Sequence, residues 1–99
     1  MAVAIITTGF PEEVGTDMYD AVGAALGVER DPPEGLIFHW AGEVDGNWTV
    51  SEVWESRDAC DRFRAERLFP TIKTVSGMDP ATAPQPTIKE YPVHNYTKP

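Results

Sequence analysis

The chain has 99 residues and a formal net charge of −8. This length fits one domain, so residues 1–99 are expected to fold as a single unit. The acidic excess argues against nucleic acid as a partner, because phosphates are bound through Lys and Arg, and against an anionic membrane surface. No apolar run approaches the ~20 residues that span a bilayer. The single cysteine, Cys60, cannot form an internal disulfide, so the cytoplasm is the expected location.

The N-terminal part of the chain predicts a strand followed by a helix. Residues 2–8 are rich in β-branched side chains, which favour a strand. A helix then starts either at Pro11, which is followed by two glutamates, or at Thr16, which can serve as the N-cap. Apolar residues at helical spacing continue to about Leu26, with Tyr19 at the edge of the stripe, and the next residue is a glycine that can end the helix.

The middle of the chain predicts a β-hairpin. Residues 36–44 and 47–55 read as strands joined by Asp45-Gly46, the strongest short-range hairpin signal in the sequence. A two-residue turn there places His39 opposite Glu52, and alternate residues share one face of the sheet. One face then carries Ile37, His39, Ala41, Glu43, Trp48, Val50, Glu52 and Trp54, and the other carries Leu36, Phe38, Trp40, Val44, Thr49, Ser51, Val53 and Glu55.

The C-terminal part predicts a second helix and a fourth strand. Ser56 is a suitable N-cap for a helix over residues 57–69, which Pro70 interrupts before a short continuation. Residues 77–86 contain one glycine and three prolines and are expected to form a surface loop. Residues 87–97 read as a strand at the edge of a sheet, because its proline cannot donate to a neighbouring strand.

This order of elements predicts a ferredoxin-like α+β sandwich of the βαββαβ type. Its four-stranded antiparallel sheet has the strand order 4-1-3-2 and carries both helices on one face. Large apolar side chains occupy both faces of the hairpin, although the helices can cover only one. We therefore expect a homodimer whose two sheets pack face to face, with Trp40 at the centre of the uncovered face and Trp54 as the alternative.

Several segments carry a resemblance that covers nearly the whole chain: GLIFH at 35–39, GNW at 46–48, VWES at 53–56, the following Phe63 and VHNY at 93–96. In these segments the sequence resembles the dimeric α+β-barrel superfamily and, more narrowly, small antibiotic-biosynthesis-monooxygenase-like (ABM-like) proteins. The resemblance implies a dimeric α+β barrel. It implies an activity only weakly, because the superfamily also includes isomerases and haem-degrading oxygenases.

The haem-degrading branch can be compared position by position. Its members have an Asn at the end of the first strand, a Trp on the second helix and an iron-ligating His about ten residues later. The corresponding positions here are Thr7 or Thr8, Phe63 and Lys73, and none of them matches. The comparison implies that this chain does not degrade haem, and no cofactor is expected.

The candidate catalytic residues are His39 and Glu52. A carboxylate opposite the imidazole orients the ring through one nitrogen and leaves the other nitrogen to take a proton. The alternative is a purely structural His–Glu hydrogen bond. Cys60 lies on the predicted buried stripe and reads as a core residue, and one cysteine with two distant histidines predicts no metal site.

The candidate substrate-binding residues are Trp54, Trp48, Phe63, Arg67 and His94. Aromatic side chains can form the walls of a pocket for flat molecules, and Arg67 can hold an anionic group. For each of them the alternative is ordinary packing or solvation.

The leading hypothesis is a small-molecule-handling homodimer that acts as a cofactor-independent monooxygenase on an aromatic or polyketide-like substrate. His39 would deprotonate an electron-rich phenol, which then reacts with oxygen itself. Two alternatives remain open. One is a non-catalytic ligand-binding or assembly protein, and the other is an isomerase or cyclase that uses the same base without oxygen.

Overall fold

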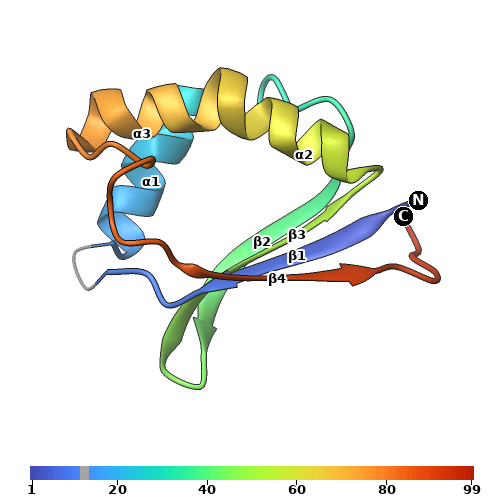
Figure 1. The fold of residues 1–99 in the computed structure, drawn as a ribbon. Helices are drawn as coiled ribbons and strands as arrows, with labels where there is room; N and C mark the ends of the chain where they lie inside the picture. The colour runs from blue at the N-terminus through green and yellow to red at the C-terminus, as the bar shows by residue number, and fades with distance from the viewer. Residues whose placement is uncertain (12–13) are drawn as a thin grey trace.

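The computed structural model describes residues 1–11 and 14–99. Figure 1 shows a sheet on one side of the molecule and helices on the other. The elements are β1 (Val3–Thr8), α1 (Thr16–Leu26), β2 (Leu36–Val44), β3 (Asn47–Trp54), α2 (Arg57–Phe63), η1 (Arg64–Leu68), α3 (Phe69–Ser76) and β4 (Thr87–Pro92). No helix in the described ranges is long and apolar enough to span a membrane.

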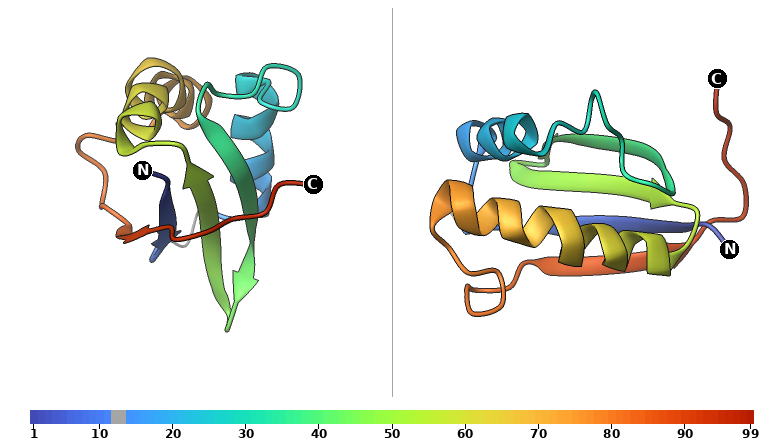
Figure 2. Two further views of the ribbon diagram at one scale, coloured as in Figure 1. Left: turned by 90° about the vertical axis from the view of Figure 1, so that its right-hand side faces the viewer. Right: turned by 90° about the horizontal axis from the view of Figure 1, so that it is seen from above.

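The sheet has the order β2-β3-β1-β4, and every neighbouring pair is antiparallel. This confirms the predicted ferredoxin-like strand order. In the part of the chain that the structure describes, all helices lie on one face of the sheet and no element covers the opposite face (Figure 2). The sheet is open, so a barrel is not closed within one chain.

The hairpin turn confirms the predicted register over most of its length. Asp45 and Gly46 both have positive φ, 52° and 80°, which is the backbone of the two-residue turn that matches the twist of the strands. His39 pairs with Glu52 as predicted. A bulge between Leu36 and Phe38 shifts the start of β2, so Leu36 pairs with Trp54. The prediction that Ile37 faces Trp54 and Leu36 lies on the other face was therefore wrong, because a bulge adds one residue to a strand and reverses its alternation.

The first helix starts within one residue of the later of its two predicted starts. Gly15 is the N-cap of α1 and Thr16 is its first helical residue, so the prediction of Thr16 as cap was wrong by one position. The two glutamates after Pro11 lie outside the described residues. Gly27 ends α1 in the left-handed conformation that glycine adopts readily, with φ 68°, which confirms the predicted stop.

The second helical segment runs without a break from Arg57 to Ser76 through α2, η1 and α3. Ser56 caps it as predicted, and its side chain accepts a hydrogen bond from the backbone N–H of Ala59 at 3.1 Å. Pro70 does not interrupt the segment but lies in the first turn of α3. The wider π-type turn of η1 immediately precedes the proline, and such turns accommodate a lost backbone hydrogen bond.

The core lies where α2 packs on the sheet. Its fully buried side chains are Ile5 on β1, Trp54 on β3 and Cys60 on α2. Gly35 makes this contact possible, because a Cβ atom at that position would lie 2.6 Å from the Cβ of Ala59. No side chain of α1 is fully buried. The helices therefore pack tightly at one end of the sheet and leave space beneath α1 and α3.

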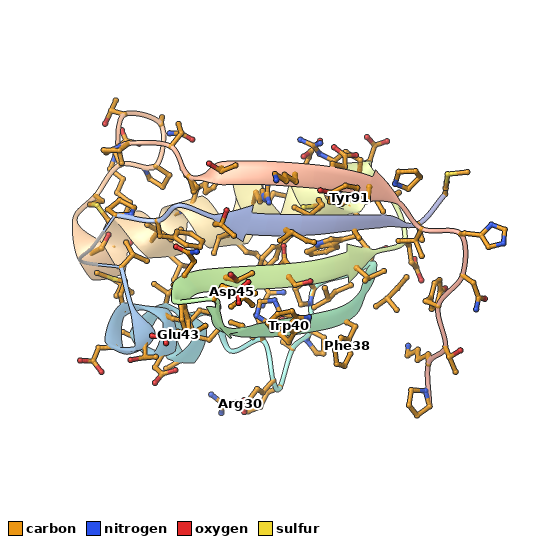
Figure 3. All side chains as sticks on the ribbon, turned by 90° about the horizontal axis from the view of Figure 1, so that it is seen from below. Arg30, Phe38, Trp40, Glu43, Asp45 and Tyr91 are labelled. Atoms are coloured by element: carbon orange, nitrogen blue, oxygen red, sulfur yellow. The ribbon has the colours of Figure 1, made fainter. Side chains whose placement is uncertain are left out.

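The uncovered face of the sheet carries large apolar side chains, which Figure 3 shows from that side. Phe38 is 63% exposed, Trp40 43% and Tyr91 47%. Phe38 pairs with Val53, Val53 pairs with Ala4, and Ala4 pairs with Tyr91. One row of apolar side chains therefore crosses all four strands. Trp40 lies on this uncovered face, where the first of the two predictions for the dimer surface places it.

Candidate functional site

A cavity of about 550 Å³ lies between the sheet and the helices. Its lining comes from α1, from all four strands, from the helical segment α2–η1–α3 and from loops that include residues 77–86. Most of the lining side chains are apolar, among them Met18, Val22, Val50, Leu68 and Ile72. A space of this size with a largely apolar wall is typical of a site for a small organic molecule.

Three polar side chains form a hydrogen-bonded chain in the wall of this cavity. Tyr19 projects from α1, and its Oη lies 2.5 Å from Nε2 of His39 on β2. The other ring nitrogen, Nδ1, lies 3.2 Å from Oε2 of Glu52 on β3. All three residues line the cavity. The cross-strand pair predicted from the hairpin is therefore present, and α1 adds a third member.

The chemistry of these groups fixes the direction of the hydrogen bonds when His39 is neutral. An ionised carboxylate only accepts, so Nδ1–H donates to Glu52, and Nε2 then accepts the hydroxyl of Tyr19. Burial raises the pKa of Tyr19 above its ordinary value, and the nearby negative charge of Glu52 raises it further. Tyr19 is therefore a neutral hydrogen-bond donor near pH 7.

Aromatic contacts hold the tyrosine ring in place. The rings of Tyr19 and His39 lie end to end in nearly parallel planes, with centroids 5.9 Å apart and an angle of 8° between the planes. Trp48 meets Tyr19 edge-on, with centroids 5.5 Å apart. Trp48 and Phe63, two of the predicted substrate-binding residues, both line the cavity.

Three predicted substrate-binding residues do not line the cavity. Trp54 has no exposed surface and packs against Phe63 in the core, with ring centroids 5.6 Å apart. Arg67 donates hydrogen bonds to the carbonyl oxygens of Leu26 and Asp31, at 3.1 and 3.0 Å. It thus satisfies the end of α1 and the loop that follows, where carbonyl groups lack helical partners.

The third residue is His94. The prediction of a strand over residues 87–97 was too long, since β4 ends at Pro92. His94 follows in the exposed tail and does not line the cavity. A backbone hydrogen bond from the N–H of Val93 to the carbonyl oxygen of Ala2, at 3.0 Å, extends the contact with the first strand by one residue, and the tail follows it.

Tyr19 and Arg64 line the cavity, and neither was among the predicted site residues. Tyr19 was placed at the edge of an apolar stripe, and the only signal for its role was its hydroxyl, which needs a polar partner when it is buried. Arg64 lines the cavity where Arg67 was expected. Both arginines lie in η1, within the basic stretch from Arg57 to Lys73. The sequence alone does not tell which of the two faces the cavity.

The remaining candidate ligands give no metal site. Within the described ranges, no three His, Cys, Asp or Glu side chains lie together in a way that could hold a metal ion. Cys60 is fully buried, and burial raises the pKa of its thiol to about 11, so it is an unreactive core residue near pH 7. Thr7 and Phe63 line the cavity, whereas Lys73, at the position of the iron ligand in haem-degrading proteins, is exposed.

No protein-family model and no curated protein matches the chain. Solved structures do match it over nearly its full length. A candidate antibiotic biosynthesis monooxygenase from Caulobacter crescentus is 16% identical, with a TM-score of 0.68 over 95% of this chain and 91% of that one. The haem degrader MhuD from Mycobacterium tuberculosis is 19% identical, with a TM-score of 0.54 over 98% and 99%.

SnoaB from Streptomyces nogalater, a cofactor-independent oxygenase, is 14% identical, with a TM-score of 0.52 over 96% of this chain and 93% of that one. These identities are low, and the three proteins differ in what they do, so the likeness concerns the fold. The resemblance inferred from the sequence is confirmed at this level. The chain has the ferredoxin-like α+β fold of the ABM-like proteins.

Proposed function

We propose that this protein is a homodimeric, cofactor-independent monooxygenase that acts on fused-ring phenols, a class that includes polyketide-like aromatics. The observation that carries the proposal is the chain Tyr19–His39–Glu52 in the wall of an apolar cavity. A flat aromatic ring suits the apolar wall, and a phenolic hydroxyl suits the polar chain, because a base there can remove its proton.

The reaction uses dioxygen as the only co-reactant. Removal of the phenolic proton gives an electron-rich phenolate, which passes electrons to dioxygen. A bond forms between the para carbon of the ring and one oxygen atom, and the O–O bond breaks. The phenolic hydrogen and the para hydrogen leave with the second oxygen atom as water. For 1-naphthol, the products are 1,4-naphthoquinone and water, and the protein supplies only the base and the dry apolar space.

His39 and Glu52 supply the base in this proposal. Glu52 orients the imidazole and stabilises the imidazolium that forms when the ring takes a proton. Trp48 and Phe63 contact the substrate ring as part of the wall. Trp54, Arg67 and His94 are not retained as substrate-binding residues, because none of them lines the cavity.

Oxygen uptake with 1-naphthol tests the proposal. We expect one dioxygen consumed per quinone formed, no turnover without oxygen, and loss of turnover in His39→Ala. Turnover that is unchanged without oxygen would instead indicate the isomerase or cyclase. Saturable binding without turnover would indicate the ligand-binding protein, since a ligand at 100 times its Kd raises the free energy of unfolding by about 2.7 kcal/mol. Either result refutes the monooxygenase.

The homodimer is part of the proposal. Phe38, Trp40 and Tyr91 give the uncovered sheet face an exposed aromatic surface, and a second copy packed on this face would bury it and close a barrel. Light scattering at low micromolar concentration tests the dimer, and one species near the 10.9 kDa of a single chain refutes it. The cytoplasm remains the expected location, because a chain with one cysteine needs no oxidising compartment.

A further inference from the structure

His39 has no free lone pair with which to take a proton from a ligand. A neutral imidazole has one N–H and one acceptor nitrogen. The N–H at Nδ1 is used by Glu52 at 3.2 Å, and the acceptor Nε2 is used by the hydroxyl of Tyr19 at 2.5 Å. Direct attack of His39 on a substrate hydroxyl would first have to break the hydrogen bond to Tyr19.

Tyr19 does have acceptor capacity left. A phenol oxygen donates one hydrogen and can accept further hydrogen bonds through its lone pairs. Its hydrogen is given to His39, and the residue lines the cavity. The hydrogen bond to His39 and the edge-on contact with Trp48 fix the tyrosine on two sides. The oxygen of Tyr19 is therefore held where it can accept from a ligand and donate to His39 at the same time.

We propose that Tyr19 is the catalytic residue that takes the substrate's proton, and that His39 takes the proton of Tyr19 in the same step. This inference rests on the proposed function for its phenolic substrate. The substrate O–H bond breaks and a new O–H bond forms on Tyr19, while the original O–H bond of Tyr19 breaks and an N–H bond forms at Nε2 of His39. The step leaves a substrate phenolate and an imidazolium next to Glu52, with no change in oxidation state.

The surroundings of Tyr19 agree with a relay rather than a stored tyrosinate. Burial and the charge of Glu52 raise the pKa of Tyr19, so the residue does not lose its proton to water near pH 7. It can act as a base only while a second group accepts its proton. His39 is that group, and Glu52 offsets the positive charge that the ring acquires.

Kinetics with 1-naphthol separate the relay from direct proton transfer. The relay predicts that Tyr19→Phe and His39→Ala each lower kcat by about 100-fold or more, and that the double variant is no slower than the slower single variant, since both belong to one unit. Direct transfer to His39 predicts that Tyr19→Phe keeps or raises kcat, because Nε2 is then free, and this result overturns the relay. Tyr96→Phe, which removes an exposed hydroxyl in the tail, is the matched control and should leave kcat unchanged.

A measurement without substrate tests the same relay independently. The ¹⁵N NMR shifts of the His39 ring, assigned with a His94→Asn variant, report which nitrogen carries the proton. We expect the Nδ1–H form near pH 7, with a shift of the Nε2 signal in Tyr19→Phe as its hydrogen bond is lost. An Nε2–H form overturns the relay. If the wild-type protein consumes no oxygen with any phenol, the proposed monooxygenase activity is refuted. The NMR result then still decides whether Tyr19 donates to His39 and His39 donates to Glu52, as the relay requires.

Discussion

Replacement of Gly35 by alanine tests the contact that joins β2 to α2. Gly35 has a φ of 87°, and the left-handed side of φ costs an L-residue about 1–2 kcal/mol. The new Cβ would also lie 2.6 Å from the Cβ of Ala59, closer than two carbon atoms can approach without a shift. Overpacking of this kind costs about 1–3 kcal/mol. Gly35→Ala should therefore lower the free energy of unfolding by about 2–5 kcal/mol.

The second mutation needed to interpret this result is Ala59→Gly. Alone it should cost about 1 kcal/mol, because glycine is a poor helix former. In the double variant with Gly35→Ala, the steric clash is removed and the backbone strain remains. The sum of the two single-variant losses in the free energy of unfolding should therefore exceed the loss in the double variant by about 1–3 kcal/mol.

Urea denaturation followed by circular dichroism measures these differences, with all variants at one protein concentration because a dimer's stability depends on concentration. Two results would refute the reasoning. One is a loss below about 0.5 kcal/mol for Gly35→Ala, the range of a neutral surface change. The other is strict additivity of the two costs, which would mean that the methyl groups do not meet.

Three further predictions concern Cys60, Trp40 and His39. Burial raises the pKa of Cys60 from 9.0 to about 11, so as the pH rises the unfolded chain loses this proton before the folded chain does. The free energy of unfolding should therefore fall by about 2 kcal/mol between pH 9 and 11. Denaturation curves measured over this pH range should lack that part of the fall in Cys60→Ala. Trp40→Glu should convert the proposed dimer to a monomer in light scattering with native circular dichroism, and a variant that stays dimeric would remove this face from the interface. His39→Ala should lower the free energy of unfolding by about 1–3 kcal/mol, because the hydroxyl of Tyr19 and the carboxylate of Glu52 each lose a hydrogen-bond partner; urea denaturation that shows no loss would mean that water replaces both contacts.

Short-range signals in the sequence account for much of the fold. Asp45-Gly46 set the turn, and the turn set the register that brings His39 opposite Glu52. Ser56 and Gly27 marked helix ends through capping, which depends only on the residue and its immediate neighbours. These features are local, so the sequence alone could predict them.

The errors arose where the outcome depends on tertiary packing. The bulge at the start of β2 reverses the direction of Leu36, and no local residue pattern marks it. Pro70 stays inside a helical segment because η1 accommodates it. Tyr19 meets His39 only because of the position of α1 over the sheet, a relation between residues twenty apart that hydrophobic periodicity does not encode.

The loose packing of α1 has a consequence for how this protein would respond to a ligand. None of the side chains of α1 is fully buried, although several of its apolar residues line the cavity. A molecule that fills the cavity would supply the apolar contacts that α1 does not obtain from the sheet, and it would act as the missing part of the hydrophobic core. Ligand binding and the local stability of α1 are then coupled. Amide hydrogens of α1 should exchange fast in the empty protein and slowly in the complex, while those of β3 change little.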